Sequence, residues 1–158
     1  MATPRRVAVD DTRYEADASA WAREQAEHLR AGRWSRLDVA HLADEIEALA
    51  RSERHALTSA LQVILLHLLK WDHQPARRTR SWTTSIRTQR LAVADRLEDN
   101  PSLVPQVGDL IARAYRRARI EAASETALAE ATFPATCPYG FEEIMTRTTP
   151  WPPEGGEA

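Results

Sequence analysis

The sequence predicts an all-α fold: a four-helix-centred bundle with one long central helix at about 38–72. Residues 38–71 contain no glycine or proline, and their apolar side chains recur at helical spacing. Three further segments show the same spacing and are separated by proline, glycine or asparagine. Strand-like alternation of useful length is absent from the sequence, so we expect helices to form the core.

The first helix is expected at about 14–31. One face of this segment carries Tyr14, Ala18, Trp21, Ala22, Gln25 and Leu29. Gly32 supplies the left-handed residue that commonly ends a helix. After a short connection, Asp38 can accept a hydrogen bond from the next turn. We therefore expect the long helix to begin at Asp38.

The long helix is predicted to face the interior along one stripe. The stripe consists of Leu42, Ile46, Leu49, Glu53, Leu57, Ala60, Ile64, His67, Leu68 and Trp71. Leu65, Leu66 and Leu69 lie outside it, so the second half of the helix is apolar nearly all round. We expect several neighbouring helices to enclose that half.

Two more helices and a C-terminal strap are expected to surround it. Ser81 is the predicted cap of the third helix, and Ser102 is the predicted cap of the fourth, which runs to about Ala127. The inner face of the third helix carries Trp82, Ile86, Gln89, Arg90, Val93 and Leu97. The fourth carries Leu103, Val107, Leu110, Ile111, Ala114, Tyr115 and Ala118. A short helix near 141–147 lies between proline-rich segments that we expect to strap onto the bundle.

The length of 158 residues suits a single helical domain, expected at 13–150, with flexible tails at 1–12 and 151–158. The formal net charge of -2 argues against a protein that wraps a polyanion. One cysteine, Cys137, excludes an internal disulfide, and the amino terminus lacks the apolar core of a signal peptide. The most apolar run, 61–71, is shorter than the ~20 residues needed to cross a bilayer. We expect a cytoplasmic protein that does not enter a membrane.

Several segments, in order along the chain, resemble one protein family. They are YEADASAW at 14–21, LADEIEAL at 42–49, RSER at 51–54, HLLKW at 67–71, QP at 74–75, SW at 81–82, IRTQR at 86–90, NPSL at 100–103 and FPATCP at 133–138. Together they resemble the bacterial family known as domain of unknown function 29 (DUF29). The resemblance implies a compact helical fold in a bacterium, and it implies no activity or catalytic residues.

Polar residues within the predicted inner stripes are the candidates for a site. Glu53, His67, Gln89 and Arg90 fall among apolar neighbours, and a buried charge needs a partner. We interpret these four as a structural cluster that fixes helix register. A sharper hypothesis is a cavity that holds a carboxylate or phosphate. Its candidate binding residues are His67, Trp71, Arg77, Trp82, Arg87 and Arg90.

Metal and cysteine chemistry are not indicated. The Glu-x-x-His pattern with which helical bundles hold paired metals is absent from the sequence. Cys137 has no basic neighbour in sequence to lower its pKa, which favours an inert thiol. We expect no cofactor and no metal.

The leading functional prediction is a non-enzymatic protein-interaction domain whose partner is another protein or a second copy of itself. It rests on the lack of an assembled catalytic motif, and on helix faces and loop tryptophans (Trp34 and Trp151) able to form contacts. Two alternatives stay open. In one, an enzyme uses His67 as acid or base while Arg87 and Arg90 hold an anionic substrate. In the other, the 77–90 segment binds nucleic acid through its arginines, with Trp82 stacking on a base.

Overall fold

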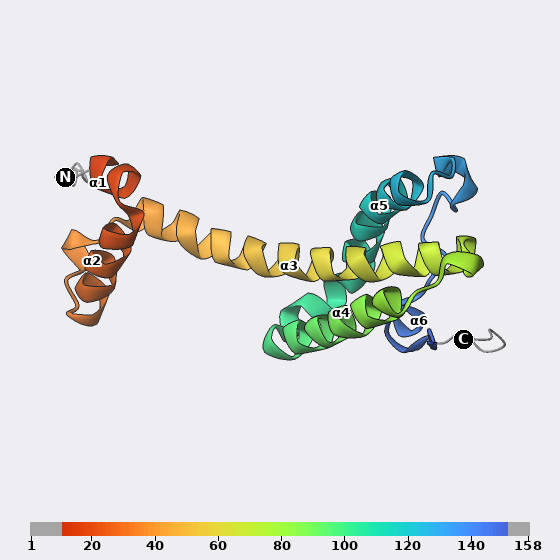
Figure 1. Ribbon diagram of the computed structural model, residues 1–158. Coiled ribbons are helices and arrows are strands. Elements are labelled where there is room, and N and C mark those ends of the chain that lie inside the picture. The colour runs from red at the N-terminus through yellow and green to blue at the C-terminus, as the bar shows by residue number, and fades with distance from the viewer. Residues whose placement is uncertain (1–10, 152–158) are drawn as a thin grey trace. The chain divides into compact units, whose positions relative to one another are not determined.

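Helices are the only regular elements in residues 11–151, the part of the chain that this computed structural model describes (Figure 1). They are α1 (Asp11–Ala16), α2 (Ala18–Arg30), α3 (Val39–His73), α4 (Arg80–Asp99), α5 (Val107–Thr126) and α6 (Phe141–Thr146). Short 3-10 turns lie between them at Trp34–Arg36, Pro75–Arg77, Pro101–Gln106 and Glu130–Thr132. The all-α prediction and the long helix are confirmed.

The described residues divide into two compact units that meet at Arg51 and Ser52, within α3. The N-terminal unit contains α1, α2 and the first part of α3, and the C-terminal unit contains the rest. The single domain expected at 13–150 stays a prediction, which one cooperative calorimetric transition of the whole chain would support. Of the two expected tails, residues 1–10 and 152–158 lie outside the described residues, and α1 already begins at Asp11.

The first predicted helix is interrupted at Asp17. Its carboxylate Oδ1 accepts a hydrogen bond from the Ala20 amide at 2.9 Å, which caps α2 and ends α1. The prediction of one helix over 14–31 is therefore wrong, because the Asp17 side chain bonds to the backbone of the next turn and starts a second helix there. Gly32 ends α2 as expected: its φ is 64°, and the Arg33 amide donates to the His28 carbonyl at 2.9 Å.

Buried Asp38 organises the N-terminal unit. Its side chain accepts hydrogen bonds from Trp21 Nε1 at 3.1 Å and from the His41 amide at 3.3 Å, and its own amide donates to Gln25 Oε1 at 2.8 Å. Burial acts to raise the pKa of Asp38, but the bonds from His41 and Trp21 outweigh it and hold the pKa below its ordinary value. The predicted start of α3 is confirmed, and the Tyr14 ring stacks on His41 at 4.1 Å.

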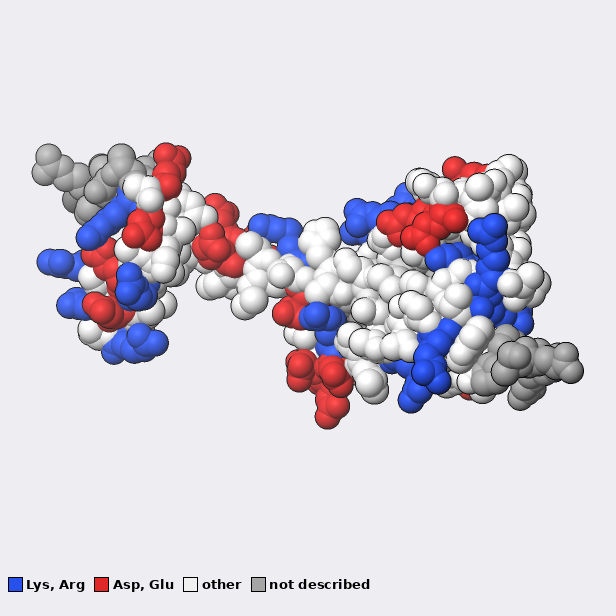
Figure 2. Space-filling model, in the orientation of Figure 1, with Lys and Arg blue, Asp and Glu red and all other residues white. Residues whose placement is uncertain are grey.

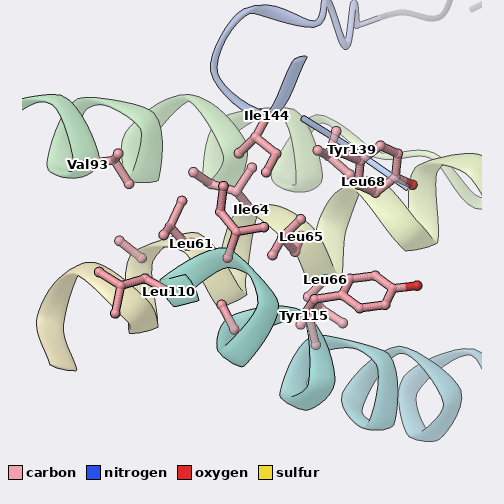
Figure 3. Packing of buried hydrophobic residues seen from close by; sticks show 14 of the residues in the cluster. Leu61, Ile64, Leu65, Leu66, Leu68, Val93, Leu110, Tyr115, Tyr139 and Ile144 are labelled. Atoms are coloured by element: carbon pink, nitrogen blue, oxygen red, sulfur yellow. The ribbon is translucent and has the colours of Figure 1, made fainter. Parts of the chain in front are cut away.

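The later part of α3 forms the core of the C-terminal unit. Its fully buried side chains are Leu57, Leu61, Ile64, Leu65, Leu68 and Leu69. Figure 3 shows Ile64 and Leu65 between Ile144 on one side and Leu110 and Tyr115 on the other. Side chains from α4, α5 and α6 therefore enclose this part of α3, as its all-round apolar sequence predicts.

The first part of the predicted inner stripe faces solvent. Ile46 and Leu49 are 68% and 66% exposed, and Leu42 is half-buried. The expectation that these three face the interior is wrong for Ile46 and Leu49. Tyr14 contacts α3 through His41 and Glu45, so the cover that α1 provides lies to one side of the stripe.

Two predicted helix caps are also wrong. Thr79 caps α4, since its Oγ1 accepts from the Trp82 amide at 3.4 Å, in place of Ser81. Residues Pro101–Gln106 form a 3-10 turn, so α5 begins at Val107 without a side-chain cap. The predicted inner residues of α5 from Val107 to Ala118 are nevertheless buried, because the helical period continues through that turn.

Replacing Leu65 tests the enclosure of α3. We expect Leu65→Ala to lower the free energy of unfolding by about 2–5 kcal/mol, because it leaves a cavity among fixed neighbours. The matched Leu91→Ala, at a residue of α4 that is 66% exposed, should cost about 0.5 kcal/mol or less. Urea denaturation followed by circular dichroism measures both, and equal losses would contradict this packing.

Candidate functional site

Helix α4 has an apolar face in the core and a polar face outside it. Ile86 and Val93 are fully buried, whereas Arg80, Thr84 and Arg87 are exposed. These three recur every three or four residues, so they share one side of the helix. The burial of Ile86 and Val93 thereby fixes the direction in which the arginines of α4 point.

The C-terminal strap, which we define as residues 133–151, is tied to α4 by two hydrogen bonds. Arg90 Nε donates to the Ile144 carbonyl at 2.8 Å, and Thr83 Oγ1 donates to the Thr149 carbonyl at 2.9 Å. Ile144 is fully buried, so the strap is anchored in the core beside the first of these bonds.

A groove lies between α4 and the end of the strap. Its volume is about 700 Å³, and we call it the arginine groove. Its lining consists of Arg80, Thr83, Thr84, Arg87 and Arg90 from α4, and of Thr146, Arg147, Thr148, Thr149, Pro150 and Trp151 from α6 and the strap. A second hollow of about 320 Å³ shares Thr84, Arg87 and Arg90 with it. Figure 2 shows a run of Lys and Arg side chains along one side of the C-terminal unit.

Arg147 is the one groove arginine held by acidic groups. Its guanidinium donates to both oxygens of Asp72, at 2.9 Å and 2.5 Å, and lies 3.7 Å from Glu143. The Tyr139 hydroxyl donates to the same Asp72 at 2.7 Å. Burial acts to raise the pKa of Asp72, but the bonds from Arg147 and Tyr139 outweigh it and hold the pKa below its ordinary value. Burial and the Asp72 bond raise the pKa of Tyr139, so both groups keep their normal charge at neutral pH.

The other groove arginines have no compensating charge. Burial, and then the positive charge of Arg147, lower the pKa of Arg90. Arg90 Nη2 is buried and has no hydrogen-bond partner. Within residues 11–151, Arg80 and Arg87 have neither an ion pair nor a hydrogen bond from their guanidinium groups. Three guanidinium groups therefore line the groove with their positive charge uncompensated.

Of the binding residues predicted from the sequence, Arg87 and Arg90 line the groove, whereas His67, Trp71, Arg77 and Trp82 are not in its lining. The half-buried His67 donates from Nδ1 to the Val63 carbonyl at 2.8 Å, and burial lowers its pKa. Trp71 is buried under the Arg78 guanidinium, which lies 4.6 Å from the ring. The Lys70 ammonium lies 4.5 Å from the Trp82 ring and pairs with Glu125, and Arg77 is exposed in the turn before α4.

The predicted polar cluster is spread over separate partners. Glu53 lies 3.4 Å from Arg96 and 3.5 Å from Asn100. Gln89 lines a different hollow beside Val63. All four predicted members are half-buried, and no recorded bond among the described residues joins one of them to another.

Other sequence hypotheses can be placed as well. Burial raises the pKa of Cys137, whose Sγ lies 3.5 Å from the Tyr139 carbonyl, so the thiol is protonated at neutral pH. Among residues 11–151, no three His, Cys, Asp or Glu side chains lie together as metal ligands would. The same stretch holds no helix with the length and apolarity needed to cross a bilayer.

Comparison with known proteins identifies the family. The model of the family described as Domain of unknown function DUF29 matches residues 13–149. The chain belongs to the DUF29 family. No curated protein and no solved structure gives a significant match. Because the DUF29 description assigns no function, the site of this DUF29 protein has to be argued from its own geometry.

Sequence reasoning missed part of the groove of this DUF29 chain. Arg147 and Thr149 were assigned only to a strap, and Arg80 was considered only for nucleic-acid binding. Arg147 is 75 residues from Asp72, so no local spacing indicated their pairing. The one available signal was a lone arginine in a strap that otherwise carries only acidic charges.

Replacing Asp72 tests the anchor of the strap. We expect Asp72→Asn to lower the free energy of unfolding at pH 7 by about 1–3 kcal/mol, because Arg147 and Tyr139 lose a charged acceptor. The folded pKa of Asp72 lies below its unfolded value of about 3.9, so this stabilisation is complete above that pH and is lost as pH falls through the folded pKa.

Urea denaturation between pH 7 and pH 3 measures this dependence. The difference in free energy of unfolding between wild type and Asp72→Asn should become smaller as the pH approaches 3. Asp95→Asn is the matched control, because Asp95 is exposed on α4 and should cost little at any pH. If Asp72→Asn lowers the free energy of unfolding by the same amount at every pH, the charge of the Asp72 carboxylate does not have the role assigned to it.

Proposed function

We propose that this DUF29 protein is a non-catalytic binding domain whose arginine groove holds a phosphate-bearing ligand. One observation carries the proposal: the guanidinium groups of Arg80, Arg87 and Arg90 line one groove without a compensating charge. A bacterial and cytoplasmic setting, expected from the sequence, is part of the same proposal.

An anion supplies what this site lacks. Burying a cation without a partner is costly, and a second cation nearby adds repulsion. The lining of the arginine groove contains no acidic residue that could offset this cost. A bound anion would accept hydrogen bonds from the exposed guanidinium groups of Arg80 and Arg87, and its charge would compensate the nearby Arg90 as well. Binding is therefore favoured by interactions that the free protein leaves unmade.

Phosphate fits the groove better than a single carboxylate does. The lining offers guanidinium groups together with hydroxyls of Thr84 and Thr148, and guanidinium groups bind phosphate with paired hydrogen bonds. A phosphate group presents more acceptor oxygens and more charge than a carboxylate. The volume of about 700 Å³ lies in the range of small-molecule sites, so it suits a phosphorylated small molecule.

The lining favours binding over catalysis. Its side chains are arginines, threonines, one proline and one tryptophan. None of these titrates near neutral pH, as a general acid or base would need to. The half-buried His67, the acid or base in the enzyme hypothesis, is bonded to its own helix and is not part of the lining.

Calorimetric titration with inorganic pyrophosphate tests the proposal. We expect binding to wild type and about tenfold weaker binding to Arg87→Gln, since a charged hydrogen bond contributes about 1.5 kcal/mol or more. Arg87 is exposed, so its replacement should leave the fold unchanged. The control Arg113→Gln removes an exposed arginine from α5 and should leave the affinity within about twofold.

A parallel titration with short single-stranded DNA and RNA separates the sources of phosphate. Nucleic acid that binds more tightly than pyrophosphate, and weakens steeply with salt, would assign the groove to a polynucleotide backbone. Equal effects of Arg87→Gln and Arg113→Gln would show attraction by net charge and overturn the groove site. Absence of binding to any of these probes at low salt would overturn the proposal.

A further inference from the structure

The arginine groove has a large aromatic side chain in its lining. Trp151 belongs to that lining and is 41% exposed, and it is the one aromatic member among the described residues. The arginines of the lining suit a phosphate group, but they give no reason for an exposed tryptophan beside them. The flat indole ring is suited to a second, uncharged part of the same ligand.

Two hydrogen bonds fix where Trp151 lies along the groove. Arg90 Nε donates to the Ile144 carbonyl. Thr83 Oγ1 donates to the Thr149 carbonyl, so later residues of the strap lie beside earlier residues of α4. The strap therefore runs antiparallel to α4. Trp151 follows Thr149 by two residues, a reach of at most about 7 Å, so it lies near the Thr83 end of the groove.

Most of the uncompensated charge lies toward the other end. Arg87 is about one helical turn beyond Thr83, and Arg90 is about two turns beyond it, or ~10 Å along the axis of α4. Arg80, about one turn before Thr83, is the exception and adds positive charge near the ring. The groove thus has a ring at one end and a cationic region that extends about two helical turns away from it.

We propose that the ligand of the arginine groove is a nucleoside diphosphate whose base stacks on Trp151. This inference rests on the proposed function and adds the class of ligand to it. In a nucleotide the sugar separates the flat base from the phosphates, as a separation of ~10 Å between ring and cationic end requires. An aryl phosphate carries its phosphate directly on the ring and is too short to contact both ends.

The groove suits a free nucleotide better than a strand of nucleic acid. Its volume of about 700 Å³ is that of a site for one small molecule. Proteins that bind single strands stack successive bases on aromatic side chains along a basic channel. The described lining of this groove offers one aromatic ring, so it can stack one base.

Calorimetric titration with ADP beside pyrophosphate tests the base contact. Both probes carry a diphosphate group, so the difference between their affinities measures the contribution of the adenosine part. We expect ADP to bind wild type about tenfold more tightly than pyrophosphate, because stacking of a base on an aromatic side chain typically contributes at least that factor. Trp151→Ala should bind ADP no more tightly than pyrophosphate, and its affinity for pyrophosphate should stay within about twofold of wild type.

Two further variants serve as controls. Trp151→Phe retains an aromatic ring and should keep most of the preference for ADP. Trp34→Ala removes a tryptophan that is 68% exposed and belongs to the N-terminal unit, so it should leave both affinities unchanged. Equal effects of Trp151→Ala and Trp34→Ala on ADP binding would overturn the proposed stacking.

Failure of this inference is distinguishable from failure of the proposed function. Pyrophosphate binding without tighter binding of ADP would overturn the nucleotide and leave the phosphate site in place. An equal loss of both affinities in Trp151→Ala would show that Trp151 supports the groove itself, which would also overturn the base contact. Absence of binding to either probe would overturn both proposals. A single-stranded oligoadenylate that binds more tightly than ADP and depends on Trp151 would assign the site to nucleic acid and overturn the free nucleotide.

Discussion

Enclosure of the later part of α3 is the constraint on which the C-terminal unit depends. From Leu57 onward, apolar side chains point in nearly every direction around this helix, so no single neighbouring helix can cover it. The inner faces of α4 and α5 cover part of the surface, and Phe133 and Ile144 from the C-terminal strap cover more. The strap is therefore part of the core, although it holds only one short helix.

The arginine groove follows from this packing. Ile144 must reach the core, and its carbonyl then lies where Arg90 donates to it. Asp72 sits at the end of α3 and fixes the next turn of the strap through Arg147 and Tyr139. With both points fixed, the strap runs beside the outer face of α4, and the arginines there line a groove. The electrostatics of the groove thus derive from where apolar side chains had to be buried.

Features that depend on helical spacing were predicted well from the sequence. Features that depend on contacts between residues distant in sequence were predicted poorly. Helical spacing alone located α3 and the inner face of α5, because burial acts on the same face turn after turn. Spacing identified Ile46 and Leu49 as one face but could not say whether the chain itself covers that face. Asp17 was assigned to the interior of a helix, because a cap and an interior residue differ only in local hydrogen bonding.

In the groove, Arg87 and Arg90 were found from their positions on α4. The structural reason for the site lies in Arg147 and Asp72, which only folding brings together.

Two features of this DUF29 protein do not contribute to the stability of the free monomer. Nη2 of the half-buried Arg90 lacks an acceptor, and Ile46 and Leu49 are exposed on a helix whose later part is buried. The anion that we propose for the arginine groove would compensate the charge of the first feature. Binding to the folded state alone stabilises it in proportion to the logarithm of the ligand concentration. Proteins commonly violate local rules at the surfaces that they use. Because the two features lie on different parts of the chain, neither is a consequence of the other, and the proposed anion accounts for the first alone.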